Sequence, residues 1–384
     1  MEADVGGEND LMAERTLVAV DVLEHRPGAG DALSERKKAG AQSMEDRLSR
    51  FHMPAESAPH ERTFMQWPSP STIYERDELD AIQNAIVRLA NVIAEHEPVV
   101  VLSDRVARVG NKAKLAASVE LWDIPTDDLW CRDSGPTFVV NDVGDLAIAH
   151  LRFNGWGGKQ SHARDGRIAT RVAMRMGVPL LETGLIGEQG GVEHDGAGLM
   201  VAHASSWMGV SRNDLPLQTI GDRLCAALGG SRMIWAPGLV NEDITDFHID
   251  ALARFTEPGK VVIQVEDNPD PSDLWSTAAA ETLRALEATR DLNGRPLELV
   301  RLGHPAHVRS PVPDFVGSYI NYYVCNGAVI APEFGDEAAD EKARETLRLL
   351  YPGREVRMLN IDPIAEVGGG IHCATQQQPS RRSI

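Results

Sequence analysis

A histidine–cysteine pair, His372 and Cys373, follows three consecutive glycines near the end of the sequence. Glycine lets the backbone approach a ligand closely or adopt positive φ angles. These glycines can therefore carry a thiol into a polar loop. A cysteine in such a setting is typical of a nucleophile that attacks an electrophilic carbon. The alternative is a cysteine that only packs, because most isolated cysteines behave as small apolar side chains.

His248 and Asp250 are a second group with chemical potential. They lie two residues apart in the segment 245–250 (TDFHID), so they share a face in a strand but not in a helix. A metal site could use both side chains with His194 as a supplement, although the H-E-x-x-H pattern is absent. The alternative is a helix start that is capped by one of the first two residues of the segment.

An aromatic residue and a carboxylate, Trp130 and Asp133, lie three residues apart, just before a Gly-Pro break at 135–136. An ion pair combined with a cation–π contact suits a flat cation. The alternative is a surface ion pair between Arg132 and Asp133 that precedes a turn. The residues alone leave both interpretations open.

Two glycine-rich segments, 153–158 (FNGWGG) and 188–196 (EQGGVEHDG), complete the set. Each is typical of a turn when it is considered alone. The sequence has no Walker loop and no Gly-x-Gly-x-x-Gly after a predicted strand. Nucleotide cofactors are therefore not indicated.

The composition excludes several classes of protein. The chain has 384 residues and a formal net charge of −19, which argues against nucleic acid and anionic membranes as partners and mildly favours cationic ligands. No apolar run approaches the length of a membrane helix, and no secretory pattern begins the chain. The four cysteines are far apart, which excludes a disulfide scaffold and indicates free thiols in a cytoplasmic enzyme.

Short hairpins, a helix and a strand recur along the chain. This order is predicted for residues 137–187 and again for 319–361, and such repetition favours a closed or radial arrangement of similar units. No linker divides residues 51–384, so we expect a single α/β domain there. Residues 1–50 are predicted to be a poorly ordered N-terminal extension. The individual elements are expected as strands at 97–103, 138–140, 146–151, 199–204, 261–265 and 356–361, a hairpin at 319–332, and helices at 166–177 and 335–350.

Taken in order, these segments resemble the agmatine deiminase family, the peptidyl-arginine deiminase-like group of guanidine-modifying enzymes. The resemblance spans residues 53–379 and rests on six motifs that follow one another in the family's order. It implies the pentein fold, a five-bladed α/β propeller of repeated ββαβ units around a central channel. It also implies that no metal or organic cofactor is needed. The six motifs lie at 53–68, 130–141, 153–158, 188–196, 245–250 and 368–379.

The resemblance also implies a role for each site residue. Cys373, as a thiolate stabilised by the substrate guanidinium or by His248, would attack the guanidinium carbon and form a covalent thiouronium intermediate. His248 would protonate the departing ammonia and then deprotonate water. Asp133 and Asp250 would each accept two guanidinium N–H groups, and Glu188 would orient His248 or hold the substrate. Three further residues would line the substrate site: Trp130, Trp156 and Gly370.

The leading functional prediction is hydrolysis of agmatine to N-carbamoylputrescine and ammonia, a reaction of polyamine metabolism that leads to putrescine. The partner would be a small cationic guanidine, and the resemblance also allows a homodimer. Three positions depart from the family pattern: Ile244 where glutamate is common, and Phe247 and Gln189 where glycine is common. These departures concern the surroundings of the channel, so the enzyme class is better determined than the substrate.

Other guanidine reactions fit the same residues. Peptidyl-arginine, free arginine or another guanidino metabolite could be deiminated, and an amidinotransferase would pass the amidino group to an amine instead of water. Free arginine should require a cation opposite its α-carboxylate, for which Arg212 and Arg309 are candidates.

Two further functions belong to different classes. A guanidine-binding protein without catalysis is disfavoured, because the cysteine, the histidine and both aspartates are present. A metal hydrolase built on His248, Asp250 and His194 would be inactivated by chelators, whereas a thiol enzyme would be inactivated by iodoacetamide.

Overall fold

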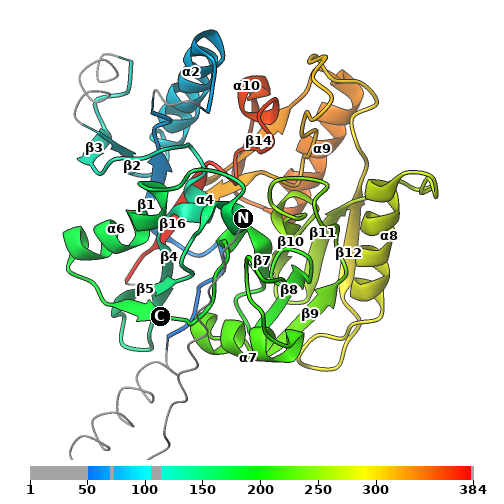
Figure 1. Cartoon of the computed structure of the whole chain (residues 1–384). Coiled ribbons are helices and arrows are strands. Elements are labelled where there is room, and N and C mark those ends of the chain that lie inside the picture. The colour runs from blue at the N-terminus through cyan, green and yellow to red at the C-terminus, as the bar shows by residue number, and fades with distance from the viewer. Residues whose placement is uncertain (1–50, 70–72, 105–113, 382–384) are drawn as a thin grey trace, which may run out of the picture. The chain divides into compact units, whose positions relative to one another are not determined.

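The computed structural model describes residues 51–69, 73–104 and 114–381 (Figure 1). The predicted extension at 1–50 lies outside these ranges. Within the described residues, 16 strands form five small sheets. In the same part of the chain, no helix combines the length and the apolar character that crossing a membrane requires.

Four of the sheets have three strands and are built by one repeated unit. The first two strands form an antiparallel hairpin, and a helix then leads to a third strand that pairs parallel to the second. A parallel neighbour requires such a crossover. The ββαβ repeat predicted at 137–187 and 319–361 is confirmed, and it recurs between them. The units are β4 (Thr137–Val140), β5 (Leu146–His150), α6 (Ile168–Met176) and β6 (Leu180–Glu182); β7 (Val192–His194), β8 (Leu199–His203), α7 (Leu217–Leu228) and β9 (Arg232–Ala236); β10 (Ala253–Glu257), β11 (Lys260–Gln264), α8 (Leu274–Glu287) and β12 (Glu298–Leu302); β13 (Tyr323–Cys325), β14 (Ala328–Glu333), α9 (Glu337–Leu350) and β15 (Glu355–Asn360).

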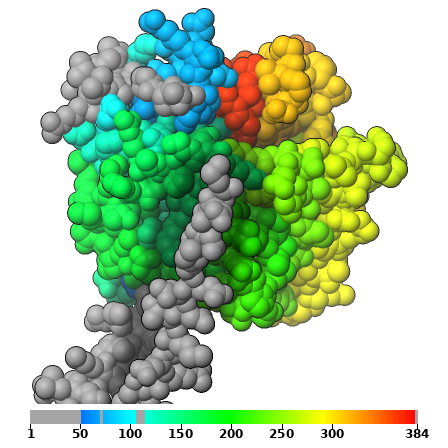
Figure 2. All heavy atoms as spheres, in the orientation of Figure 1, coloured from blue at the N-terminus to red at the C-terminus, as the bar shows by residue number. Residues whose placement is uncertain are grey.

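The fifth sheet joins the two ends of the described chain. Its strand order is β16 (Thr375–Pro379), β1 (His60–Gln66), β2 (Val99–Ser103) and β3 (Val119–Asp123). β16 pairs antiparallel to β1, and α2 (Arg76–Ile93) leads to β2, so the C-terminal strand completes a ββαβ unit that the N-terminal segment begins. α10 (Asp362–Ala365) packs against α2, as Figures 1 and 2 show in red and blue. Cys373 lies two residues before β16 and is therefore held by this closure.

The local sequence explains where the elements end. β2 is buried along its whole length, as expected for a central strand with parallel neighbours and covered faces. α6 and α7 each end at a glycine in the left-handed region, Gly177 with φ 65° and Gly229 with φ 73°, where other residues are strained. α9 begins at Asp336, whose side chain accepts a hydrogen bond from the backbone of Ala339.

α9 provides a matched test of the packing. Leu347 is fully buried and Leu349 is 82% exposed on the same helix. We expect Leu347→Ala to lower the free energy of unfolding by about 2–5 kcal/mol, because it leaves a cavity in the core. Leu349→Ala should change it by less than about 0.5 kcal/mol. Urea unfolding followed by circular dichroism measures both values, and equal losses would contradict the orientation of α9.

Candidate active site

Each connection between consecutive sheets brings a polar side chain to one site. Cys373 lies between β15 and β16, and the other side chains follow β3, β6, β9 and β12 in the same way. Active sites commonly use such loops, because a rigid scaffold positions them. These other side chains are Asp133 in α4 (Cys131–Ser134), Glu188, the pair His248 and Asp250, and Asn321.

The Cys373 thiol is fixed by three other segments. Its Sγ lies 3.2 Å from Nδ2 of Asn321 and 3.6 Å from Oδ2 of Asp250. The Cys373 amide donates to Oδ1 of Asn321 at 3.2 Å, and the Cys373 carbonyl accepts from the amide of Arg132 at 3.0 Å. Asn321 therefore contacts both the backbone and the sulfur of the predicted nucleophile.

The glycines before Cys373 are required by close approach. A Cβ atom at Gly370 would lie 2.4 Å from Oδ1 of Asn321, and a Cβ atom at Gly369 would lie 2.3 Å from the ring of Trp130. Both distances are too short for carbon contacts. The glycines therefore let the backbone pass close to other groups, as expected, and these groups are side chains of the protein, Trp130 and Asn321.

His248 lies between two carboxylates. It is 4% exposed, with Nδ1 at 3.6 Å from Oδ1 of Asp133 and Nε2 at 3.4 Å from Oε2 of Glu188. Burial alone would lower the pKa of His248, but Asp133 and Glu188 outweigh burial and raise the pKa to about 9. The imidazole is therefore protonated near neutral pH.

Asp133 and Asp250 each keep one carboxylate oxygen without a hydrogen bond from any described residue. The other oxygen of Asp133 accepts from Nε1 of Trp156 at 2.8 Å, and that of Asp250 is bonded to Nδ1 of His372 at 2.7 Å. Buried acceptors are normally satisfied, yet Oδ1 of both aspartates is buried and accepts no hydrogen bond from a described residue, although Oδ1 of Asp133 is ion-paired with His248. A flat cation with several N–H groups would satisfy both aspartates.

These groups surround one point of the backbone. A Cβ atom at Gly190 would lie 2.7 Å from Oδ1 of Asp133, 2.9 Å from Nδ1 of His248 and 3.3 Å from Oδ2 of Asp250. The second glycine of the predicted E-G-G motif therefore allows two carboxylates and an imidazole to converge. A larger residue here would separate them.

The two aspartates differ in their affinity for protons. Burial, with smaller contributions from Glu188 and Asp250, raises the pKa of Asp133 to about 6. Burial acts on Asp250 in the same direction and is the largest single influence, but the hydrogen bond and charge of His372, together with the charges of His248 and Arg132, outweigh it and lower the pKa of Asp250. Burial and the charges of Asp250 and Asp133 raise the pKa of the Cys373 thiol well above its usual range. The thiol is therefore protonated in this arrangement of charges.

Glu188 forms a buried ion pair with Arg212. Burial opposes ionisation of Glu188, but Arg212 and His248 together outweigh it and lower the pKa of this glutamate. Arg212 also donates to the carbonyl of Thr245 at 3.2 Å, whereas Arg309 is paired with Asp362 at 2.7 Å. Both candidates for binding a substrate carboxylate are therefore engaged within the protein.

The residues that follow His248 form a single 3-10 turn, Ile249–Ala251, instead of the helix considered as an alternative. Oγ1 of Thr245 accepts from the amide of His248 at 3.0 Å. Phe247, for which the resemblance implies a glycine in the family, has a φ of 71° and stacks on the ring of His203 with 4.4 Å between ring centroids. Its side chain belongs to a hydrophobic cluster with residues of β10, β11 and α8.

Sequence reasoning missed several residues around the site. Arg132 and Asp133 do not form the surface ion pair considered above, because both are buried and Arg132 instead binds Glu56 at 3.3 Å and Gln377 at 2.8 Å. No motif points to Asn321. His372 and Glu56 lie within the last and the first of the six motifs. Their polar side chains were the only feature of the sequence that could have indicated a role at the site.

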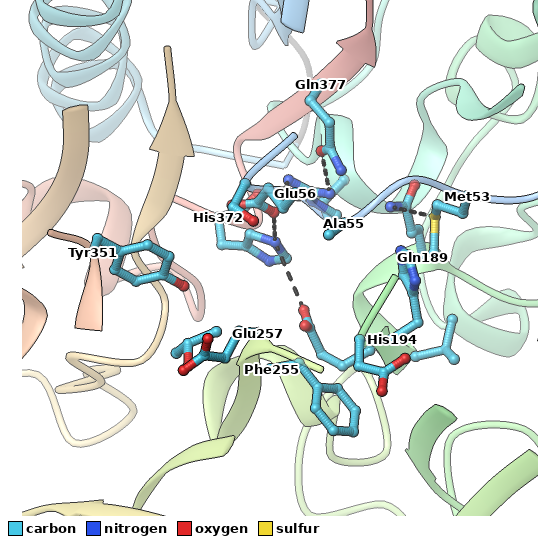
Figure 3. Close-up of a pocket in the computed structure, with 16 residues that line it drawn as sticks. Met53, Ala55, Glu56, Gln189, His194, Phe255, Glu257, Tyr351, His372 and Gln377 are labelled. Atoms are coloured by element: carbon cyan, nitrogen blue, oxygen red, sulfur yellow. Dashed lines mark hydrogen bonds and ion pairs between the residues drawn. The ribbon is translucent and has the colours of Figure 1, made fainter. Parts of the chain in front are cut away.

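A small pocket lies on the Glu56 side of His372 (Figure 3). It does not include Cys373, His248 or Asp133. Across the residues that the structure describes, no three histidine, cysteine or acidic side chains are placed to share a metal ion. The lining of the pocket beside His372 includes Met53, Glu56, Gln189, Glu193, His194 and His372.

Comparison with known proteins places this geometry in a family. Residues 52–379 match the family described as Porphyromonas-type peptidyl-arginine deiminase. The agmatine deiminase of Ectopseudomonas mendocina is 33% identical over 361 residues, which cover 87% of this chain and 97% of that protein. The agmatine deiminase of Pseudomonas syringae is 33% identical over 360 residues, with the same coverage of 87% and 97%.

A solved structure supports the same assignment. The agmatine deiminase of Enterococcus faecalis superposes with a TM-score of 0.80 at 26% identity, covering 86% of this chain and 96% of that one. The predicted α/β pentein fold of repeated ββαβ units is thereby confirmed. The chain belongs to the Porphyromonas-type peptidyl-arginine deiminase family.

Proposed function

We propose that this protein hydrolyses a small guanidine through a covalent intermediate on Cys373, with agmatine as the leading substrate and N-carbamoylputrescine and ammonia as products. The observation that carries the proposal is the pair of buried aspartates, each with an Oδ1 that accepts no hydrogen bond from a described residue, beside the Cys373 thiol and the His248 imidazole. The relatives named agmatine deiminase support the same chemistry.

Substrate binding would activate the nucleophile. A guanidinium between Asp133 and Asp250 would neutralise the two charges that, after burial, raise the pKa of Cys373. Its positive charge would also stabilise the thiolate directly. The thiol proton then passes to solvent, and the thiolate adds to the guanidinium carbon, forming the C–S bond of a tetrahedral adduct.

His248 would serve first as an acid and then as a base. Its imidazolium gives a proton to the departing nitrogen, the C–N bond breaks, and ammonia leaves a thiouronium on Cys373. The neutral imidazole then takes a proton from water as the water adds to the same carbon. The C–S bond breaks, the hydroxyl proton passes to solvent as the C=O bond of the ureido product forms, and the thiolate returns. Glu188, 3.4 Å from Nε2, would keep the ring oriented.

The surroundings favour a substrate without a carboxylate. Arg212 is paired with Glu188 and Arg309 with Asp362, so neither is available to an α-carboxylate. Agmatine lacks this group and free arginine carries it. The net charge of −19 also favours a dication over a zwitterion at long range.

Ammonia release tests the proposal. We expect the purified chain to release ammonia from agmatine. It should release at least about tenfold less from arginine or a blocked arginyl peptide, because both arginines considered for binding a substrate carboxylate are paired with acidic residues of the protein. Cys373→Ala should abolish release from every substrate, since no thiolate is left to form the intermediate. Full activity of this variant would overturn the mechanism.

Cys225 offers a matched control for the loss of a thiol. It is a free cysteine on α7, outside the site. Cys225→Ala should retain agmatine hydrolysis, and circular dichroism should show that both alanine variants are folded. Release from arginine or the peptide, with none from agmatine, would keep the chemistry and change the substrate.

The pH profile tests the state of Asp133. With a pKa of about 6, Asp133 is about nine-tenths protonated at pH 5 and about nine-tenths ionised at pH 7. A protonated carboxyl loses its charge for the guanidinium, so kcat/KM for agmatine should rise from pH 5 to pH 7 and then level off. Steady-state kinetics at constant ionic strength measure this rise. A constant kcat/KM across this interval would contradict the assignment.

A further inference from the structure

His372 is held between two carboxylates, one of which faces the site. Its Nδ1 lies 2.7 Å from Oδ2 of Asp250, and its Nε2 lies 2.7 Å from Oε2 of Glu56. His372 is 2% exposed. A neutral imidazole has a single N–H and could donate to only one of two ionised carboxylates, whereas an imidazolium donates to both.

Glu56 is itself strongly anchored. Its Oε2 lies 2.8 Å from Arg254 and 3.3 Å from Arg132, and its Oε1 accepts from the amide of Val324 at 2.9 Å. Burial opposes ionisation of Glu56, but Arg254 and His372 outweigh it and hold its pKa well below the usual range. The far side of His372 therefore rests on an ionised carboxylate that cannot move freely.

This arrangement distinguishes the two aspartates of the guanidinium site. Asp133 receives a neutral donor, Trp156, and a histidine at 3.6 Å. Asp250 receives the short bond from His372 and a longer one from Asn321 at 3.4 Å. Charge-assisted hydrogen bonds are about twice as strong as neutral ones. Figure 3 shows His372 and Glu56 next to each other among the residues that line the pocket.

We propose that His372 is a positioning residue that, braced by Glu56, holds the carboxylate of Asp250 oriented toward the guanidinium. The inference rests on the proposed function, because it assigns Asp250 to substrate binding. His372 acts through Asp250 and does not touch the reacting carbon. Arg132 and Arg254 would secure the brace from the side of Glu56.

Two substitutions separate the two faces of the ring. In His372→Asn the amide nitrogen lies near the position of Nδ1 and keeps a donor for Asp250. In His372→Gln it lies near Nε2 and keeps a donor for Glu56. A residue needed only for packing would tolerate or reject both amides alike. A positioning role predicts that Asn is the better replacement.

The probe is alkylation of Cys373 by a matched pair of reagents, chloroacetamidine and chloroacetamide. In both, sulfur displaces chloride to form a C–S bond, and the thiol proton passes to solvent. Only the amidine is a flat cation that the two aspartates can bind. The ratio of the two rates, measured by mass spectrometry of the intact protein, therefore reports the guanidinium site without requiring turnover.

We expect wild type and His372→Asn to share this ratio within about threefold. His372→Gln should lower it by about 10- to 100-fold, since one charge-assisted hydrogen bond to Asp250 is lost. His194→Asn is the control, because His194 lines the same pocket and is not bonded to Asp250 in the structure. It should leave the ratio unchanged. In turnover, kcat/KM for agmatine should follow the same order.

The outcomes separate the two proposals. If wild type prefers the amidine but the Asn and Gln variants have equal ratios, the role of His372 is overturned and the proposed function stands. If wild type shows no preference for the amidine, the guanidinium site fails and both proposals fall. If one amide variant does not fold, the other still tests the role of His372 by comparison with wild type and His194→Asn. A ratio near that of wild type is expected for His372→Asn and a lowered ratio for His372→Gln, and the opposite result in either variant overturns the role.

Discussion

The site depends on keeping several like charges together, away from water. Asp133, Glu188 and Asp250 are all buried, and they surround an imidazole and a thiol. An unpaired buried charge costs several kcal/mol, so the protein must supply partners that do not fill the place of the substrate. Each carboxylate has a partner within the protein: Arg212 pairs with Glu188, His372 with Asp250, and Trp156 donates to Asp133. His372 and Trp156 both bind the Oδ2 atom of their aspartate. The Oδ1 atoms of Asp133 and Asp250 accept no hydrogen bond from a described residue, so they can accept N–H groups from a ligand.

The repeated fold meets this requirement because each junction between sheets delivers one part. Asp133, Glu188, Asn321 and Cys373 each come from a different connection, and His248 and Asp250 share a fifth one. Closure through β16 and β1 is important for the same reason. It connects the segment of Cys373 to the most N-terminal sheet strand and to Glu56, which precedes that strand. The position of the thiol thus depends on pairing between residues about 300 positions apart in the chain.

The sequence predicted the motifs and the repeated unit, because both are local. Hydrophobic runs and turn residues marked β2, β14 and α9 to within a few residues. The partners behind the site are not local. Asn321 reaches Cys373 from a loop without a motif, and Arg212 pairs with Glu188 although a role at a substrate carboxylate was considered for it. Composition and motif spacing cannot predict these pairings, because the paired residues are far apart in the chain and meet only in the folded arrangement of the five sheets.

The loop before His248 shows how this chain varies around fixed chemistry. Asp246 and Phe247 have φ angles of 61° and 71°, conformations that cost non-glycine residues about 1–3 kcal/mol each. Burial of the Phe247 ring between His203 and Trp275, together with the ion pair of Lys159 with Asp246, opposes this cost. The ring packs into the core of the neighbouring unit. A phenylalanine in place of glycine therefore changes how the loop is anchored, while His248 still lies between its two carboxylates.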